Sequence, residues 1–560
     1  MTNNTLSSLL EGFLHWEKIK PNDLYMVQPL ADGSVIELTW GEVGYQARCM
    51  ASYLKSLHLK KGTNIGILGK NSAHWIIADL AIWMSGHVSV PLFATLNADS
   101  TAFILDHSEV QFIFVGKLDG ISDNWNELKS GIPEALPQIA LPMAPITGFP
   151  TWDDTILDQV PMLEITLPGT EQLATIVYTS GSTGRPKGVM HSHRSMMSMN
   201  NNLKTIFGLN ESDRFYSYLP LAHVGERAFV ESVSLLNGCQ VYFNDNLDTF
   251  SNDMMRAKPT IFFSVPRLWT KFYLSITKLL SKRQQLEILG DSEESIVLKK
   301  TALENLGLQH TRLALTGTAP LPEGIVKWYR SIGLEMIEAY GMSENMAVSH
   351  FSRPGSVRIG YVGPPSVGVE ARISDIGELE VKSPGQMIGY FKDPDKTAKD
   401  MTVDGFFKTG DRGEIDEQQR LRITGRVKDL FKTSKGKYVA PVPIEQILGN
   451  HSKIEIVCVA GSGEPQPFAL IVLSPAAQEI ILSVEGKESI KLELLALLFE
   501  VNSCLEKHEK LNYFVVLKKP WSIENGFLTP TLKIRRNIIE DNYVKYAGEW
   551  LENGEPIIWY

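Results

Sequence analysis

The sequence predicts an α/β protein with two α/β units, a small β-rich unit and a separate α+β domain at the C-terminal end. Three observations support this. Short apolar runs alternate with amphipathic helical stretches up to about residue 345, which favours a largely parallel sheet. Short alternating runs bounded by Gly and Pro begin near residue 355, and a new α/β pattern follows a basic loop near 428. A chain of 560 residues also exceeds the size of one small core.

The first α/β unit is expected over the first ~170 residues. Periodicity predicts helices over 40–57 and 72–85. Strands are predicted over 64–68, 88–92 and 110–115, and the apolar run 173–177 reads as a buried strand.

The second unit is expected over about 190–345, with strands near 214–218, 240–243, 260–264, 312–316 and 335–338. Residues 279–310 are polar and helix-prone, which predicts a solvated helical excursion. In the β-rich unit, 377–381 reads as a strand and 413–425 as a hairpin around 416–419. We place the boundary near 426–428, giving domains 1–427 and 428–560.

Composition narrows the function classes. The hydrophobic fraction of 43% and charged fraction of 21% are ordinary for a globular protein, and a net charge of −10 argues against a general nucleic-acid binder. Four scattered cysteines without a Cys-x-x-Cys pair indicate free, buried thiols in a reducing cytosol and no zinc site. The N-terminus has no secretory pattern, and no stretch reaches the ~18 apolar residues of a membrane span. Peripheral contact with a membrane stays open.

Residues 178–188, Tyr-Thr-Ser-Gly-Ser-Thr-Gly-Arg-Pro-Lys-Gly, form the most informative segment. Glycines allow a tight turn that brings N–H groups close to an anion, hydroxyls add donors, and Arg185 and Lys187 add positive charge. The segment therefore predicts a phosphate-binding loop, with a flexible surface loop as the alternative. It lacks the Gly-Lys-Ser/Thr of a P-loop and the Gly-x-Gly-x-x-Gly of a dinucleotide loop.

Five further clusters carry candidate chemistry. Gly317-Thr318-Ala319-Pro320 and Tyr340-Gly341-Met342-Ser343-Glu344 each follow a short apolar strand, where open α/β sheets bind ligands; ordinary turns are the alternative. Asp411 ends a Gly-rich segment and could bind ribose hydroxyls or cap a turn. The remaining clusters are a basic stretch over 425–437, the segment 528–536, and His223 in Leu-Pro-Leu-Ala-His-Val-Gly-Glu-Arg. We expect His191 and His193 to mark a helix start and not a metal site.

Taken together, these motifs resemble the adenylate-forming superfamily of acyl-CoA synthetases, adenylation domains and luciferases. The segments Leu-Pro-Leu-Ala-His-x-x-Glu-Arg and Leu-Thr-Pro-Thr-x-Lys are most similar to the long-chain fatty acid–CoA ligases. The resemblance implies a large AMP-binding domain and a small, mobile C-terminal domain. It also implies an ATP- and AMP-binding set of Thr179, Ser180, Gly181, Ser182, Thr183, Gly184, Lys187, Gly317, Thr318, Ala319, Pro320, Tyr340, Gly341, Met342, Ser343, Asp411 and Arg426.

The same resemblance implies individual roles. Tyr340 would stack on adenine, Ser343 would contact a phosphate, and Glu344 would hold Mg²⁺, a cation suited to carboxylate and phosphate oxygens. The implied catalytic residues are Lys533, Lys187, Arg426 and Glu344. Most of the superfamily has a Gly where this chain has Leu532, so Arg535 is the fallback for Lys533.

Further implied roles concern the acid and coenzyme A. His223 would lie in the acyl pocket, Lys428 would be the hinge, and Lys432 and Gly436 would line the coenzyme A channel. The implied reaction uses ATP, Mg²⁺ and coenzyme A to convert a fatty acid, most similar to a long-chain one, first to an acyl-adenylate and then to acyl-CoA.

Alternatives stay open on the sequence alone. They are a ligase that loads a carrier protein, a ligase for a medium-chain or other acid, and a non-catalytic nucleotide-binding relative. An α/β-hydrolase is disfavoured because no Gly-x-Ser-x-Gly is present. We expect a cytoplasmic enzyme.

Overall fold

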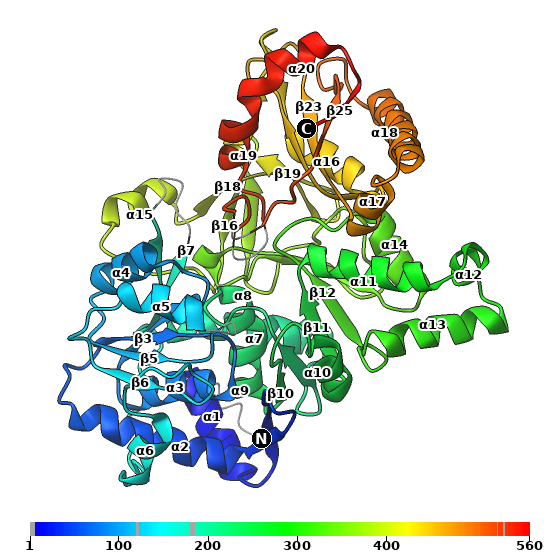
Figure 1. The fold of residues 1–560 in the computed structure, drawn as a ribbon. Coiled ribbons are helices and arrows are strands. Elements are labelled where there is room, and N and C mark those ends of the chain that lie inside the picture. Colours follow the sequence, from blue (N-terminus) through cyan, green and yellow to red (C-terminus); the bar gives the residue numbers. More distant parts are fainter. Residues whose placement is uncertain (1–5, 119–121, 180–184, 523–524, 530–532) are drawn as a thin grey trace.

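The computed structural model describes residues 6–118, 122–179, 185–522, 525–529 and 533–560. Two sheets with helices against them form the large N-terminal part, coloured blue to green in Figure 1, and a third sheet lies above them. The C-terminal residues, orange to red, form a separate layer at the top of the view. The predicted α/β architecture, with a large N-terminal and a small C-terminal part, is confirmed.

The first large sheet is mostly parallel. Its strands, in spatial order, are β17 (Gly389–Tyr390), β8 (Lys187–Ser192), β7 (Leu173–Thr179), β4 (Val88–Leu92), β3 (Asn64–Leu68), β5 (Phe112–Val115) and β6 (Gln138–Ala140). Only the pairs β17–β8 and β8–β7 are antiparallel. The strand predicted over 110–115 is present as β5, which begins two residues later than predicted. The sequence analysis predicts no strand over 187–192, where β8 lies.

The second large sheet is also mostly parallel, with antiparallel edges. Its order is β14 (His350–Phe351), β13 (Met336–Tyr340), β12 (Leu313–Thr316), β11 (Ile261–Ser264), β9 (Arg214–Ser217), β10 (Gln240–Phe243), β1 (Leu24–Pro29) and β2 (Val35–Thr39). The strands predicted for this unit are confirmed. The pairing of β1 with β10, which brings the N-terminal hairpin into this sheet, was not expected.

The remaining strands form smaller sheets. The β-rich unit is β15 (Glu370–Ile373), β16 (Glu378–Lys382), β18 (Phe407–Ile415) and β19 (Leu421–Arg426), all antiparallel. The predicted hairpin around 416–419 is confirmed as β18–β19. Beyond it lie the hairpin β20 (Phe431–Lys432) and β21 (Tyr438–Val439), and a sheet of β22 (Ile454–Ala460), β23 (Phe468–Leu473), β24 (Phe514–Leu517) and β25 (Ile557–Trp559).

Helices cover these sheets. Those of the N-terminal part are α1 (Leu9–Ile19), α2 (Trp40–Ser56), α3 (Ala73–Met84), α4 (Ala98–His107), α5 (Ser122–Ser130), α6 (Trp152–Leu157), α7 (His193–Phe207), α8 (Val224–Glu226), the π-helix η1 (Arg227–Ser232), α9 (Val233–Asn237), α10 (Phe250–Ala257), α11 (Pro266–Leu279), α12 (Lys282–Glu287), α13 (Glu293–Asn305), α14 (Glu323–Ser331) and α15 (Pro394–Asp400). Those that follow are α16 (Pro441–Gly449), α17 (Pro475–Ile480), α18 (Val484–Cys504), α19 (Arg536–Tyr543) and α20 (Ala547–Asn553).

The core of the N-terminal part centres on α3. All twelve residues of this helix are buried, because it is apolar around most of its circumference. Its one charged residue, Asp79, forms a fully buried ion pair with Arg227 at the start of η1, and Arg227 also pairs with Glu231 at 2.8 Å. Burial raises the pKa of Glu231 well above its usual range. This ionic group ties α3 to the π-helix that follows His223.

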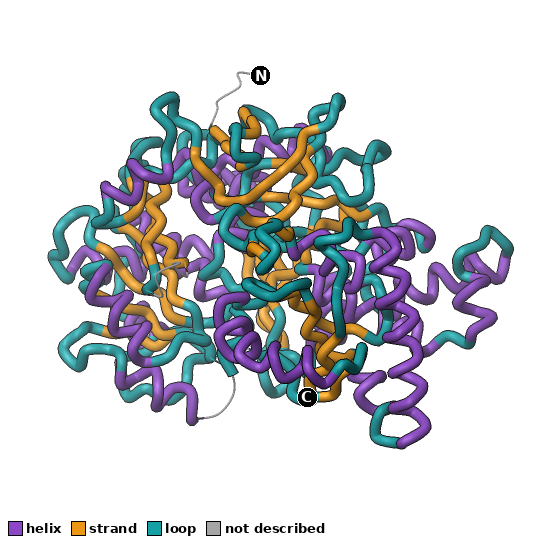
Figure 2. Tube along the Cα trace, turned by 90° about the horizontal axis from the view of Figure 1, so that it is seen from above, coloured by secondary structure: helices purple, strands orange, loops and turns teal. Residues whose placement is uncertain are grey.

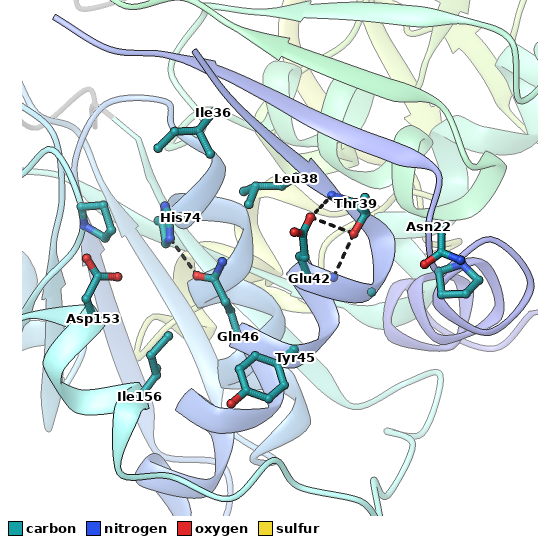
Figure 3. Close-up of a pocket in the computed structure, with 13 residues that line it drawn as sticks. Asn22, Ile36, Leu38, Thr39, Glu42, Tyr45, Gln46, His74, Asp153 and Ile156 are labelled. Carbon is teal, nitrogen blue, oxygen red and sulfur yellow. Dashed lines mark hydrogen bonds between the residues drawn. The ribbon is translucent and has the colours of Figure 1, made fainter. Parts of the chain in front are cut away.

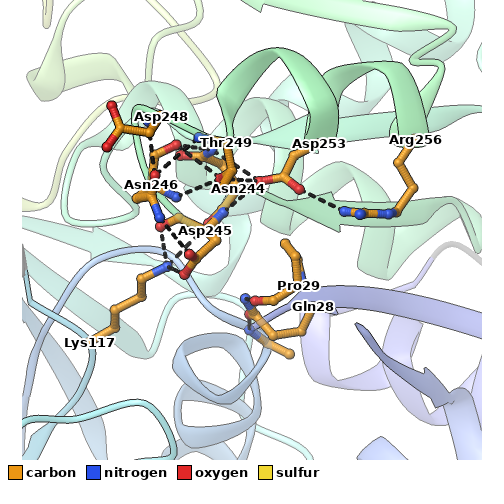
Figure 4. Close-up of polar contacts among 11 residues, drawn as sticks. Gln28, Pro29, Lys117, Asn244, Asp245, Asn246, Asp248, Thr249, Asp253 and Arg256 are labelled. Carbon is orange, nitrogen blue, oxygen red and sulfur yellow. Dashed lines mark hydrogen bonds and ion pairs between the residues drawn. The ribbon is translucent and has the colours of Figure 1, made fainter. Parts of the chain in front are cut away.

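A second polar cluster joins the two large sheets (Figure 4). Lys117, just after β5, lies 2.7 Å from the carboxylate of Asp245, just after β10. The Asp245 N–H donates to Asp253, which also accepts from the Thr249 hydroxyl at 2.7 Å and pairs with Arg256 at 2.6 Å. The cluster therefore fixes the loop after β10 against the neighbouring unit.

The helical excursion is confirmed as α12 and α13, which project with α11 from the side of the molecule (right in Figures 1 and 2). All four cysteines are free. Three are buried as expected, but Cys504 is exposed, because it lies at the solvent-facing end of α18. Among the described residues, no helix is both long and apolar enough to cross a membrane.

Candidate active site

The segment 178–188 connects two antiparallel strands. Thr179 at the end of β7 pairs in register with Lys187 at the start of β8. Five predicted nucleotide-binding residues lie outside the described part of the chain, namely Ser180, Gly181, Ser182, Thr183 and Gly184. The Thr179 hydroxyl is buried and has no hydrogen-bond partner among the described residues. A phosphate oxygen bound by this segment would satisfy such a group.

Lys187 reaches from β8 to the loop after β13. Its Nζ lies 2.5 Å from Glu344 Oε1 and donates to the Tyr390 hydroxyl at 2.8 Å. The Tyr390 oxygen is also 2.9 Å from Glu344 Oε1 and 3.1 Å from Asp400 Oδ2. Burial would raise the pKa of Glu344, but the Lys187 charge and these hydrogen bonds lower it below its ordinary value. Glu344 is therefore ionised at neutral pH, as a cation ligand must be.

Tyr390 and Asp400 are not predicted as site residues. Tyr390 reaches Lys187 across a separation of 203 residues because β17 pairs with β8. No local sequence pattern indicates that pairing, since β17 is only two residues long.

The loops 317–320 and 341–344 leave the same edge of the second sheet. They follow β12 and β13, which pair with Thr316 opposite Glu338. At Gly341 a Cβ would lie 2.4 Å from the Ala347 carbonyl oxygen, so no side chain fits. Thr318 has a φ of +72°, a left-handed conformation that is uncommon for a non-glycine residue. Backbone strain of this kind often accompanies ligand sites.

Asp411 links these loops to the β-rich unit. Its Oδ2 accepts a hydrogen bond from the Tyr340 hydroxyl at 2.6 Å, and its Oδ1 lies 3.0 Å from Arg426 Nε. Asp411 and Arg426 are paired in register on β18 and β19. The Asp411 charge raises the pKa of Arg426, and this effect outweighs burial, which lowers it. Tyr340, Asp411 and Arg426 thus form one polar group.

Lys533 approaches the same group from the C-terminal part. Although the residue remains exposed, the protein around its ammonium and the charge of Arg426 lower its pKa to about 8, against the opposing effect of Asp411. Its backbone N–H donates to the Thr529 hydroxyl at 3.0 Å, and its carbonyl accepts from the Thr529 N–H at 2.8 Å. These two hydrogen bonds join Lys533 to Thr529. Arg535, the fallback, donates to the Gly526 carbonyl at 3.4 Å.

His223 caps the short helix α8. Its Nδ1 accepts a hydrogen bond from the Gly225 N–H at 3.0 Å, which leaves the proton of the neutral ring on Nε2. Burial, and then the nearby Lys533 charge, lower the pKa of His223 to about 4. The imidazole is therefore neutral at physiological pH and can donate from Nε2.

An aromatic wall that the sequence analysis does not predict lies beside His223. A Cβ on Gly225 or on Gly317 would lie 3.8 Å or 3.4 Å from the ring of Phe263. Phe263 stacks on Phe229 of η1, with ring centroids 4.5 Å apart. The apolar surface thus runs from the His223 loop toward the π-helix, an irregular element that is frequent at functional sites.

The histidines after the phosphate loop have structural roles. His191 lies in β8 and donates from Nε2 to the Ser343 carbonyl at 2.7 Å, while α7 begins at His193. Burial lowers the pKa of both to about 4. Among the described residues, no three His, Cys, Asp or Glu side chains are grouped as a metal site. A single carboxylate such as Glu344 suits Mg²⁺ that arrives with substrate phosphates.

The predicted hinge and coenzyme A residues lie apart from this cluster. Lys428 is exposed in the turn after β19. Lys432 lies in β20, and Gly436 turns the β20–β21 hairpin with a φ of +76°. Across the described ranges, no hydrogen bond or ion pair joins the hairpin to Asp411 or Glu344.

Two contacts hold the C-terminal part in this orientation. Arg267 of α11 lies 2.8 Å from Glu455 of β22, and the Gly324 N–H of α14 donates to Asn450 at 3.2 Å. In this orientation the Lys533 charge is near enough to lower the pKa of His223, while no hydrogen bond or ion pair within the described ranges joins the β20–β21 hairpin to Asp411 or Glu344.

A cavity of about 850 Å³ lies elsewhere, near α2 and α6 at the bottom of Figure 1 (Figure 3). Its polar side chains bond to one another. His74 Nε2 lies 2.9 Å from Gln46 Oε1, and Thr39 and Glu42 form a capping box. Because the residues singled out by the sequence motifs gather around Asp411 and Glu344 and not at this cavity, we place the candidate site at that cluster.

Two family models match this chain. The model described as "AMP-binding enzyme" matches residues 14–391, and the model "AMP-binding enzyme C-terminal domain" matches residues 428–547.

Similar proteins of known name extend over most of the chain. Fatty acyl-CoA synthetase A of Dictyostelium discoideum is 29% identical, over 93% of this chain and 87% of that protein. A long-chain-fatty-acid–CoA ligase of Mycobacterium bovis is 28% identical over 93% of each chain. Among solved structures, an anthranilate CoA ligase in complex with anthranoyl-AMP has a TM-score of 0.78 at 22% identity, covering 97% of this chain and 98% of the other.

Proposed function

Because the chain belongs to the AMP-binding enzyme family, we propose that it activates a long-chain fatty acid with ATP and transfers the acyl group to coenzyme A. The names of its relatives support this substrate. The observation that carries the proposal is the position of Lys533, which comes from the C-terminal part and lies near Arg426, Asp411 and His223.

On the nucleotide side, the loops 317–320 and 341–344 would bind adenine against Tyr340. Asp411 would exchange its bond to the Tyr340 hydroxyl for the ribose hydroxyls, and Arg426 would hold it in place. Thr179, the residues 180–184 and Lys187 would bind the phosphates, with Ser343 beside them. Mg²⁺ bound by Glu344 would supply positive charge to the phosphate oxygens. Lys187 would leave Glu344 when the phosphates arrive.

In the first step the fatty acid carboxylate attacks the α-phosphorus of ATP, and the bond to pyrophosphate breaks. His223, neutral with its proton on Nε2, would donate to a carboxylate oxygen and orient it; a base is not needed. Lys533 would stabilise the charge that develops on the phosphate oxygens. Catalysis rests on positioning and charge stabilisation, without a protein nucleophile.

In the second step the coenzyme A thiol attacks the acyl carbon, and AMP leaves. We propose that residues 428–560 rotate about Lys428 relative to residues 1–427 for this step. The rotation would separate Arg267 from Glu455, withdraw Lys533, and bring Lys432 and Gly436 to the site. Domain closure about a few hinge residues is a common device of this kind.

Chain-length dependence tests the substrate class. An apolar tunnel gains ~0.8 kcal/mol per buried CH₂, so kcat/KM should rise about fourfold per methylene until the tunnel is full. We expect an optimum at roughly C12–C18, by analogy with similar enzymes. Measuring kcat/KM from C2 to C20 checks this. A peak at C2–C4, or activity on aromatic acids alone, would contradict the long-chain assignment and leave the adenylation assignment intact.

The acceptor is tested separately. Release of acyl-CoA with free coenzyme A supports the proposed ligase. Adenylation without any acyl-CoA would instead favour transfer to a carrier protein.

We also propose that this cytoplasmic enzyme contacts membranes peripherally, through the tip of the α11–α13 arm. Exposed aliphatic side chains concentrate there: Leu279, Leu286, Leu289, Ile296 and Val297 are 52–74% exposed. The stretch 257–286 leading into it holds six Lys or Arg and no Asp or Glu. An exposed leucine between basic residues, such as Leu279 between Lys278 and Lys282, suits the interface of an anionic bilayer, while Glu287, Asp291, Glu293 and Glu294 lie further along the tip.

Vesicle co-sedimentation tests whether the α11–α13 arm binds membranes. Leu279→Ser with Leu286→Ser should weaken binding to phosphatidylglycerol-containing vesicles by on the order of tenfold. A matched control is Leu482→Ser with Val484→Ser, where the side chains are 86% and 84% exposed on the C-terminal part. Equal binding by both variants, or no preference of the wild type for anionic lipid, would remove this proposal without touching the catalytic one.

A further inference from the structure

Arg536 has an unusually dense set of contacts for a residue without a catalytic assignment. Its side chain is only 11% exposed. Nη2 donates to both carboxylate oxygens of Glu445, at 2.6 and 2.8 Å, and Nη1 donates to the Val459 carbonyl at 2.8 Å. Nε lies 3.5 Å from Asp429 Oδ2.

The partners of Arg536 connect three elements of the C-terminal part. Asp429 directly follows the proposed hinge Lys428, Glu445 lies in α16, and Val459 lies in β22. Glu445 also accepts from the Val459 N–H at 2.7 Å. The elements α16 and β22 are therefore joined by this direct hydrogen bond and by the Arg536 guanidinium, which bonds to both residues. A planar, multidentate guanidinium suits this bridging role, and a lysine could make only part of it.

The segment that carries Lys533 leads directly along the chain to Arg536. Arg536 lies three positions after Lys533, so their Cα atoms are at most ~10 Å apart. Hydrogen bonds join Thr529 to Lys533, a bridge joins Leu528 to Ile534, and the Arg535 N–H donates to the Phe527 carbonyl at 2.8 Å. Movement at Arg536 would therefore be passed to Lys533.

We propose that Arg536 is a positioning residue, which fixes the segment that carries Lys533 relative to the hinge and so aims Lys533 at the adenylation site. The proposal rests on the function proposed above. Among the described residues, Arg536 makes no hydrogen bond or ion pair with the nucleotide cluster. Its partners all lie beyond the hinge, so the same contacts travel with the C-terminal domain when it rotates.

Half-reactions separate this role from a merely structural one. In Arg536→Met, ATP–pyrophosphate exchange should fall roughly 10- to 30-fold, as misplacement of a charge-stabilising group by about 1 Å would do. Thioester formation from supplied acyl-adenylate should change less than threefold. Arg536→Lys should recover part of the exchange activity. Glu445→Gln should reproduce the loss, because it removes the other end of the anchor.

Chemical labelling gives a readout that does not depend on turnover. The pKa of Lys533, about 8 in the wild type, should return toward that of a free lysine in Arg536→Met. Acetylation of Lys533 at pH 7.5, followed by mass spectrometry, should then slow by about tenfold. The labelling experiment remains informative if the wild type activates no fatty acid, so it distinguishes failure of this inference from failure of the proposed function.

The matched control is Lys545→Met, which also removes a positive charge from the C-terminal part. Lys545 is exposed, and its ammonium lies 5.2 Å from the ring centroid of Tyr546. We expect near-wild-type exchange and labelling. If Arg536→Met and Glu445→Gln lower both half-reactions equally while Lys533 labelling stays unchanged, Arg536 only stabilises the domain and the proposal is overturned. Exchange activity at the wild-type level in a folded Arg536→Met would overturn it as well.

Discussion

Replacing Lys533 with alanine should lower fatty-acid-dependent ATP–pyrophosphate exchange by roughly 10²–10³-fold, the usual cost of removing one donor from a charge-stabilising site. The reason is its position near Arg426, Asp411 and His223, where negative charge develops on phosphate during the first step. Thioester formation from supplied acyl-adenylate should be largely spared. Isotope exchange and acyl-CoA release, measured on the same preparation, check both halves.

The pH dependence of adenylation provides a second check on Lys533. The protein around its ammonium and the charge of Arg426 lower its pKa to about 8, so the side chain is charged below that pH and neutral above it. The Lys533-dependent part of the exchange rate should therefore decline as pH rises through about 8. Lys533→Arg keeps its charge throughout this range and should lack that decline. Unchanged exchange in Lys533→Ala would refute the assignment and move the role to Arg535.

Much of the fold could be predicted because its signals are local. The strands β3, β4 and β10 have the predicted bounds, since each is a short, mostly apolar run that can be recognised from its own residues. The α2 helix begins at Trp40 as expected, after the Thr39 and Glu42 capping box. Hairpin β18–β19 follows from its turn residues. These elements need no knowledge of distant contacts.

The parts that escaped prediction depend on distant pairing. β1 joins β10 and β17 joins β8, and neither short strand identifies its partner. The same holds in the site. Glycine-rich loops and Asp411 stand out by residue type, whereas Tyr390, Phe263 and Arg536 acquire their roles only from what the fold places beside them. A buried Arg and an exposed Arg, such as 536 and 535, look alike in sequence.

Gly436→Trp should have the opposite effect to Lys533→Ala. A bulky ring on the β20–β21 hairpin should obstruct the proposed thiol channel after domain rotation and abolish most acyl-CoA formation. Adenylation should persist, because in the present orientation the hairpin makes no hydrogen bond or ion pair with the described residues around Asp411 and Glu344. Pyrophosphate exchange and thioester formation should then separate in one variant.

Strain must be distinguished from bulk in this test. Gly436 has a φ of +76°, so any side chain costs about 1–2 kcal/mol there. There is space for a Cβ, however, since its nearest contact would be Lys432 Cε at 3.8 Å. Asn tolerates this conformation, so Gly436→Asn carries a small strain without the bulk and should retain both half-reactions. If Asn abolishes thioester formation as completely as Trp, the glycine serves only the hairpin turn. If Trp lowers both half-reactions together, the loop is structural and the second orientation of the domain loses its support. Loss of thioester formation in Trp alone is the result that the rotating-domain mechanism requires, because only the rotated orientation brings residue 436 to the site.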